Sequence, residues 1–211
     1  CCPAVAWEST GWLASVEELV AEIEKDIPFY DQSGGGVTFS GGEPLAQLDF
    51  LLALLKGCRQ KEIHRAVDTT GFAPTETVAE VNRHSDLFLY DLKLMDPTKH
   101  RHFTGHSNHL ILQNLKMLST SGAKIVVRIP LIPGVNDDAD NLRQTADFVT
   151  GLPHRHPVEL LPFHRAAAHK YGKLGLNYPA QDLLPPGPDQ LSAAAVCLHK
   201  AGLTVLTGGG S

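Results

Sequence analysis

The sequence is poor in several features that would each assign it to a class. Four unevenly spaced cysteines in 211 residues exclude a disulfide scaffold and agree with a reducing cytoplasm. No unbroken apolar run is longer than residues 50–55, which is far short of a membrane span, and no signal peptide pattern precedes it. Lysine and arginine residues are scattered rather than clustered, and the net charge of -5 does not favour binding of nucleic acid. We therefore expect a cytoplasmic protein without membrane or nucleic acid partners.

The composition is otherwise that of a globular protein. Hydrophobic residues make up 43% and charged residues 19%, so the chain carries no disorder signature and is long enough for one large domain. It begins with Cys1 rather than Met, and we expect it to be a fragment of a longer protein.

Apolar strand patterns alternate with helical patterns along the whole chain. The expected strands are residues 34–39, 65–68, 87–90, 124–131, 158–161 and 203–206, and the expected helices are residues 15–27, 50–56, 75–83, 110–119, 138–149 and 189–200. Pro28 is expected to end the first helix. Connections of this kind impose parallel strands with right-handed crossovers. The expected class is α/β, with all units in one sheet or barrel.

The central stretch is residues 36–44, GVTFSGGEP, in which an apolar run stops at two glycines, a carboxylate and a proline. The run predicts a buried strand, and the glycines allow backbone geometry and close approach that a Cβ would prevent. Pro44 is suited to open the next helix. An ordinary turn between strand and helix would have the same pattern, so the functional interpretation depends on the residues downstream.

Polar groups recur wherever an expected strand ends. They are Gly41, Gly42 and Glu43 after the first strand, Asp68 after the second, Asp91 with Lys93 after the third, and His164 after the fifth. Parallel strands bring such ends to one face, so these groups suit a small zwitterionic ligand. Each also has a structural alternative: Asp68 could cap its own turn, Asp91 could pair with Lys93, and His164 is one of 11 histidines.

Two further observations concern this face. Arg128 lies within the fourth strand, where an inward-pointing guanidinium needs a carboxylate or an anionic ligand. No Ser or Cys stands beside a base in these loops, which argues against nucleophilic catalysis.

Five motifs together resemble the activating enzymes of glycyl radical enzymes, the pyruvate formate-lyase activase group of the radical S-adenosylmethionine superfamily. They are GVTFSGGEPLAQ, DTTGF, DLFLYDLKLMD, VVRIPLIPGVND, and ELLPFH followed by HKYGKLG, in matching order from about Cys2 to His199. The resemblance implies a partial (β/α)6 TIM-like barrel of parallel strands that holds S-adenosylmethionine and a [4Fe-4S] cluster. It also implies an activase that forms a glycyl radical on a partner enzyme through a 5'-deoxyadenosyl radical, with flavodoxin or ferredoxin as electron donor.

The resemblance assigns roles to the residues at the strand ends. Gly41, Gly42 and Glu43 would bind the methionyl amine of the cofactor, and Asp91 with Lys93 would lie at its carboxylate. The remaining implied roles are a monovalent cation held by Asp68 and Asp91, a contact of His164 with the adenosyl side, and Arg128 lining the same cavity.

One departure from the family pattern concerns the cluster. The family holds it with a CxxxCxxC motif after the first barrel strand, and this sequence has no such motif. We expect the first strand and the cluster loop to be absent from this chain, which would then be inactive alone. Cys58 and Cys197 fall in separate expected helices and match no family ligand, so we interpret them as buried or surface thiols.

The resemblance also implies a division of the chain. Cys2 before Pro3 matches the end of a ferredoxin-like insert, in which Cys2 would ligate an auxiliary [4Fe-4S] cluster. Residues 1–10 are then a remnant of that insert, residues 11–207 the partial barrel, and residues 208–211 a flexible tail.

Two alternative functions fit the same residues. A truncated module could bind S-adenosylmethionine or the glycyl radical protein without chemistry. A divalent-metal hydrolase could use Asp68, Asp91 and His164 on a barrel, although Gly41, Gly42, Glu43 and Lys93 would then have no role.

Overall fold

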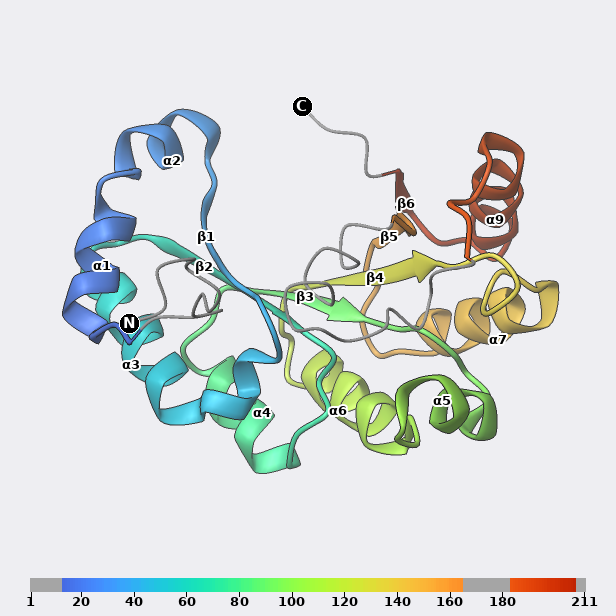
Figure 1. Ribbon diagram of the computed structural model, residues 1–211, viewed down its shortest axis with the longest axis horizontal. Helices are drawn as coiled ribbons and strands as arrows, with labels where there is room; N and C mark the ends of the chain where they lie inside the picture. The colour runs from blue at the N-terminus through green and yellow to red at the C-terminus, as the bar shows by residue number, and fades with distance from the viewer. Residues whose placement is uncertain (1–12, 165–182, 208–211) are drawn as a thin grey trace, which may run out of the picture.

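The computed structural model describes residues 13–164 and 183–207, which form a curved sheet with helices along its outer side (Figure 1). The strands are β1 (Gly36–Phe39), β2 (His64–Thr69), β3 (Leu87–Asp91), β4 (Ile125–Leu131), β5 (Val158–Pro162) and β6 (Val205–Thr207). The helices are α1 (Val16–Glu24), α2 (Ile27–Ser33), the 3-10 helix η1 (Pro44–Gln47), α3 (Leu48–Gln60), α4 (Thr75–Asn82), α5 (Pro97–Thr104), α6 (His109–Thr120), α7 (Ala139–Thr150) and α9 (Pro188–Lys200).

The six strands pair in the order of the sequence, and every pairing is parallel. This arrangement confirms the predicted α/β class with a TIM-like partial barrel of parallel strands. Within the described residues the sheet is open, with β1 at one edge and β6 at the other. Because all strands run the same way, their carboxyl ends form one rim of the curved sheet.

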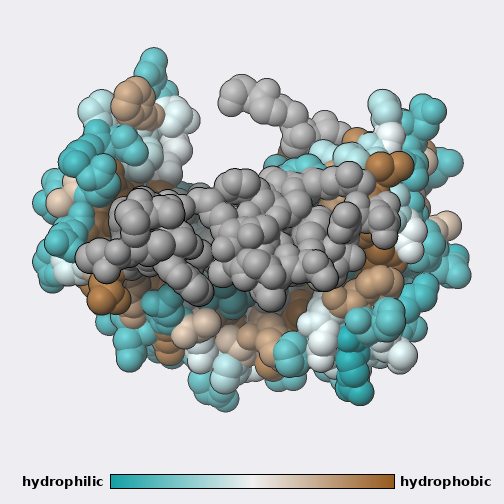
Figure 2. Space-filling model, viewed as in Figure 1, coloured by the Kyte–Doolittle hydropathy of each residue, from teal (hydrophilic) through white to brown (hydrophobic). Residues whose placement is uncertain are grey.

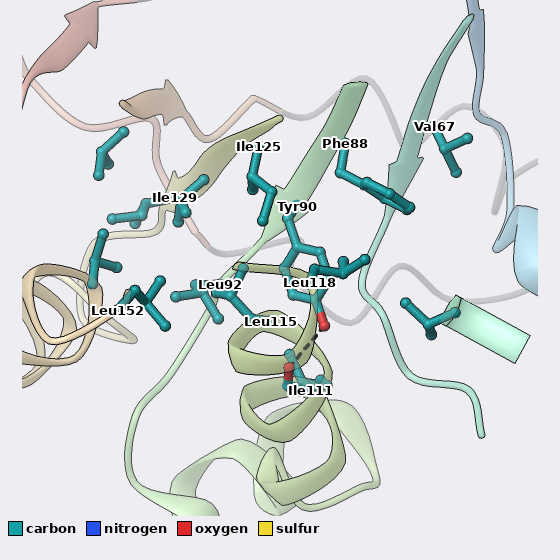
Figure 3. Packing of buried hydrophobic residues seen from close by; sticks show 14 of the residues in the cluster. Val67, Phe88, Tyr90, Leu92, Ile111, Leu115, Leu118, Ile125, Ile129 and Leu152 are labelled. Atoms are coloured by element: carbon teal, nitrogen blue, oxygen red, sulfur yellow. Dashed lines mark hydrogen bonds between the residues drawn. The ribbon is translucent and has the colours of Figure 1, made fainter. Parts of the chain in front are cut away.

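The hydrophobic core lies between the sheet and the helices. Along β4 the residues Ile125, Val127, Ile129 and Leu131 are buried, and the residues between them point to the inner face of the sheet. Figure 3 shows this packing around α6, where the hydroxyl of Tyr90 donates a hydrogen bond of 2.7 Å to a backbone carbonyl of that helix. The outer face of the sheet therefore supplies stability and leaves its inner face for polar side chains.

Strand β1 differs from the prediction of a buried strand. Gly36, Val37 and Phe39 are only partly buried, and Thr38 is exposed. The reason is position, because β1 is an edge of the described sheet and pairs with β2 alone. An apolar run of four residues indicates a strand but does not tell a central strand from an edge strand.

The prediction that Pro28 ends the first helix is also wrong. Helix α1 already ends at Glu24, and Pro28 lies in the first turn of α2. A proline at this place needs no amide hydrogen and starts a helix as readily as it stops one. The capping box of Ser15 and Glu18 at the start of α1 is present as the sequence indicates.

No helix in the part of the chain that the structure describes is long and apolar enough to cross a bilayer. Figure 2 shows hydrophilic residues along the outer margin of the arc on this face, with hydrophobic residues between them. The predicted insert remnant, residues 1–10, and the tail, residues 208–211, lie outside the described residues, and the division of the chain stays a prediction.

Candidate functional site at the carboxyl rim of the sheet

The glycine turn after β1 is anchored by its carboxylate. Glu43 accepts hydrogen bonds of 2.6 Å from the hydroxyls of Thr69 and Thr70, and one of 3.0 Å from the backbone N–H of Thr70. Gly41 has a φ of 123°, and no atom lies within 4 Å of the place where a Cβ would stand at Gly41 or Gly42. The Glu43 side chain thus ties the turn to the end of β2, and the two glycines leave open backbone beside it.

A row of charges crosses the inner face of the sheet at Arg128. Its guanidinium lies 3.1 Å from Oδ2 of Asp68 on β2 and 3.0 Å from Oε2 of Glu159 on β5. The hydroxyl of Ser40 donates a hydrogen bond of 2.9 Å to the same oxygen of Asp68. Arg128 therefore points to the inner face, where two carboxylates pair with it, and it does not point out at the helices.

The third strand end carries the second cationic group of the rim. Nζ of Lys93 lies 2.9 Å from Oδ2 of Asp91, and both side chains are part-buried. Asp91 is the register partner of Arg128, so this pair continues the charged row of the inner face. The structural alternative that Asp91 pairs with Lys93 is thus what the structure shows.

Buried asparagines hold the loop that carries Lys93. The side-chain amide of Asn136 donates to the carbonyl of Lys93 at 2.9 Å and to that of Pro130 at 2.7 Å. Asn108 donates to the carbonyls of two residues further along the same loop. Neither asparagine is exposed by more than 1%. The loop is thereby fixed to β4 and α6 rather than left to move.

His164 stands apart from these groups. It is the second residue after β5, so it lies beyond the same rim, but its side chain is exposed. It makes no hydrogen bond or ion pair with another residue of the described ranges. The structure therefore connects Glu43, Asp68, Asp91, Lys93 and Arg128 with the rim through side-chain contacts and places His164 there by strand position alone.

Several polar residues of the site were not singled out by sequence reasoning. They are Ser40, Thr69, Thr70, Asn108, Asn136 and Glu159. The alternation along β5 places Glu159 on the same face as Arg128, and this signal would have found it. The asparagines carry no such signal, because their partners are backbone carbonyls distant in sequence.

The described residues assemble no side-chain site for a divalent metal or an iron-sulfur cluster. Residues 13–164 and 183–207 contain no group of three His, Cys, Asp or Glu side chains that could hold a metal ion. Asp68, Asp91 and His164 are thus not assembled as a divalent-metal site. Cys58 is buried in α3 and Cys197 lies in α9, both as free thiols, as predicted. Burial raises the pKa of Cys58, against the opposing charge of Arg65. Cys2 lies outside the described residues.

The residues of the rim do fit S-adenosylmethionine. This cofactor carries a sulfonium and an ammonium together with one carboxylate. The rim offers open glycine backbone at Gly41, a Lys93 ammonium, and more carboxylates than cationic side chains. Charges of both signs are therefore available along one rim for such a ligand.

Comparison with known proteins assigns the class. The family model of the radical SAM superfamily matches residues 1–149. The trans-4-hydroxy-L-proline dehydratase activating enzyme of Clostridioides difficile is 48% identical over 189 residues, which are 88% of this chain and 62% of that enzyme. The pyruvate formate-lyase-activating enzyme of Staphylococcus aureus is 37% identical over 85% of this chain and 74% of its own length. The chain belongs to the radical SAM superfamily.

A solved structure narrows this assignment. A domain of the pyruvate-formate lyase-activating enzyme from Bacteroides vulgatus is 41% identical, with a TM-score of 0.70, over 83% of this chain and 99% of that domain. Within the superfamily the chain is thus a member of the glycyl radical enzyme activating enzymes. It spans 62% of the length of the Clostridioides difficile relative and 65% of the choline trimethylamine-lyase activating enzyme of Oleidesulfovibrio alaskensis.

Proposed function

We propose that this chain is the S-adenosylmethionine-binding part of an enzyme that generates a glycyl radical on a partner glycyl radical enzyme. The observation that carries the proposal is the charged rim, where Glu43, Asp68, Asp91 and Glu159 outnumber Lys93 and Arg128. An excess of carboxylates on a partly buried face favours a ligand with two positive centres, and the lysine accommodates its single carboxylate.

Each residue of the rim has a proposed role. The backbone of Gly41 and Gly42, with Glu43 fixing their turn, receives the methionyl amine. Asp91 and Lys93 lie at the methionyl carboxylate. We further propose that Asp68 and Asp91 hold a monovalent cation. His164 contacts the adenosyl side of the cofactor, and Arg128 forms part of the cavity wall. Lys93 now pairs with Asp91, so binding would replace one anionic partner of the lysine with another.

The chemistry needs residues beyond this chain. S-adenosylmethionine, when its sulfonium is cleaved, supplies the 5'-deoxyadenosyl radical that takes a hydrogen atom from one glycine of the partner. The sequence has no CxxxCxxC motif for the [4Fe-4S] cluster, so we propose that the chain alone is inactive. Flavodoxin or ferredoxin is the proposed electron donor, Cys2 a proposed ligand of an auxiliary [4Fe-4S] cluster, and the cytoplasm the proposed location.

Titration calorimetry of the chain with S-adenosylmethionine tests the binding site. We expect saturable binding that weakens about ten-fold in Lys93→Met, a loss of about 1.4 kcal/mol, because the variant loses the cation that meets the carboxylate of the ligand. Lys99→Met is the matched control, because Lys99 is exposed on α5 and among the described residues its ammonium pairs only with Asp138, at 3.6 Å. Absence of saturable binding at millimolar cofactor, or equal loss in both variants, would contradict the assignment.

A second experiment separates the activase from a truncated binding module. The chain extended by the residues that precede it in its reading frame is reconstituted with iron and sulfide and mixed with reductant, S-adenosylmethionine and a glycyl radical enzyme. A glycyl radical signal in electron paramagnetic resonance supports the activase. Binding of S-adenosylmethionine without any radical signal supports the module, and a divalent-metal-dependent hydrolase activity that survives aerobic handling would support the hydrolase.

A further inference from the structure

A pocket beside the charged rim shares Asp91 and Lys93 with the proposed cofactor site and extends from them to residues that have no role there. It has a volume of about 170 Å³ and lies between the loop after β2, the loop after β3 and helix α5. Cavities of about 150 Å³ hold a benzene ring. We call it the His100 pocket, after the most buried histidine in its wall.

The imidazole of His100 is fixed in one orientation. Its Nδ1 lies 2.6 Å from the backbone carbonyl of His106, which can only accept a hydrogen bond, so Nδ1 carries the proton. The ring is 4% exposed, and Nε2 has no partner among the described residues. The neutral ring therefore offers one lone pair at Nε2, on a side chain that lines the pocket.

The remaining wall is largely aromatic and apolar. The rings of Phe72 and His106 stack with their centroids 4.7 Å apart and an angle of 27° between their planes. Ile111 from α6 lines the same space, and Lys93 with Asp91 closes the side toward the rim. A flat ring is the shape that such a wall contacts best, because aromatic pairs favour offset stacking.

We propose that the His100 pocket binds a six-membered aromatic ring that carries a hydroxyl group. The ring packs against the Phe72–His106 stack, and its hydroxyl donates a hydrogen bond to Nε2 of His100. The shared chemistry is that of a phenol, whether as a tyrosine side chain of a partner protein or as a free phenolic compound. A plain hydrocarbon in the pocket would cover Nε2 without giving it a partner, which is costly, so this hydrogen bond favours the phenol over the plain hydrocarbon.

Titration of the chain at pH 8 with p-cresol and with toluene tests the proposal by ligand-observed NMR. The two probes differ only in the hydroxyl, and we expect p-cresol to bind about ten-fold more tightly. Nitrogen-15 spectra of the wild-type histidines should show a shift of the His100 Nε2 resonance with p-cresol and none with toluene. This measurement requires no substitution and therefore does not depend on the folding of a variant.

The variant His100→Asn isolates the acceptor. An asparagine amide stands where Nδ1 stands, so it keeps the donor to the His106 carbonyl and removes Nε2. We expect it to bind both probes alike. His102→Asn on the exposed side of α5 is the control and should keep the preference for p-cresol.

Two further titrations identify the source of the ring and show which results would contradict the proposal. N-acetyltyrosinamide binding as tightly as p-cresol supports a protein side chain, and binding of p-cresol alone supports a small molecule. Equal binding of p-cresol and toluene by the wild type would overturn the proposal. Displacement of p-cresol by S-adenosylmethionine would also overturn it, since the pocket would then belong to the cofactor site.

Discussion

Arg128 on β4 and Asp68 on β2 form an ion pair of 3.1 Å across the strand that lies between them. The same guanidinium contacts Glu159 on β5 at 3.0 Å, so the Arg128 side chain links three strands, β2, β4 and β5, on the inner face. All three side chains are between 21% and 24% exposed. These part-buried charges depend on each other, because removal of the cation leaves two carboxylates without a cationic partner.

The first prediction concerns this row. Arg128→Met should lower the free energy of unfolding by about 2 kcal/mol, since two part-buried carboxylates lose their shared partner. Urea denaturation at pH 7 measures the change. Arg143→Met is the control, because Arg143 pairs with Asp140 on an exposed face of α7, where such a pair contributes less than about 0.5 kcal/mol. Equal losses in the two variants would mean that the row across the sheet contributes no more than a surface pair.

The second prediction concerns the close approach of Gly71 to Tyr90. Gly71 has a φ of 68°, and a Cβ there would lie 1.8 Å from the hydroxyl oxygen of Tyr90. That hydroxyl is held by the carbonyl of Ile111, as Figure 3 shows, so it cannot move aside without losing a buried hydrogen bond. We expect Gly71→Ala to destabilise the protein by more than about 3 kcal/mol in thermal or urea denaturation.

A second glycine with a positive φ distinguishes the steric clash of an added Cβ from the strain of the backbone conformation. Gly105 also has a positive φ, 83°, but nothing lies within 4 Å of its added Cβ. Gly105→Ala should therefore cost only about 1 kcal/mol, the cost of the backbone conformation. If the two alanine variants were equally stable, contact with Tyr90 would not be the reason for glycine at position 71.

The third prediction concerns the asparagine that holds the Lys93 loop. Asn136→Ala should cost about 3 kcal/mol in urea denaturation, because the carbonyls of Lys93 and Pro130 and the amide of Ile132 all lose their partner. Asn82→Ala is the control, since Asn82 makes one exposed hydrogen bond of 3.1 Å to Ser121 and should cost less than about 1 kcal/mol. A small effect at Asn136 would show that the loop is held by other contacts.

The same loop shows where prediction from sequence succeeds and where it stops. The alternation of apolar runs and helical patterns predicts all six strands and their parallel direction, because period and turn residues are local properties. Strand direction then places Asp68 and Asp91 at one rim without any knowledge of packing. Asn136 was not predicted as a site residue, because its role depends on hydrogen bonds to backbone carbonyls that lie near it only in the folded chain.

The partners of the charged side chains at the rim were also beyond prediction from the sequence. Residue type and strand position predicted that Glu43 and Asp91 would lie at one rim, and the family resemblance added Arg128, but neither named the partners of Glu43 and Arg128. In the structure Glu43 accepts hydrogen bonds from two threonines and Arg128 donates one to Glu159, so side chains expected to contact a ligand already contact other side chains. Partner choice depends on distances between strands, and a pattern along one strand does not contain them.

The last prediction concerns the pH dependence of the Arg65–Asp86 pair. Arg65 donates from Nε and NH2 to the two carboxylate oxygens of Asp86, at 2.8 and 2.7 Å. Burial alone would raise the pKa of Asp86, but the hydrogen bonds and charge of Arg65 outweigh it and hold that pKa below its ordinary value. The folded state thus keeps the carboxylate ionised at a pH where the unfolded chain already binds a proton.

This pair should therefore stabilise the protein above about pH 4, the ordinary range of an aspartate, and lose its contribution as the pH falls further. Asp86→Asn should unfold more easily at pH 7 by about 1 kcal/mol and show a shallower loss of stability between about pH 5 and pH 3 than the wild type. Urea denaturation at several pH values measures both slopes. Asp31→Asn, at an exposed carboxylate of α2, is the control and should keep the wild-type slope. A wild-type slope in Asp86→Asn would show that other carboxylates govern acid unfolding.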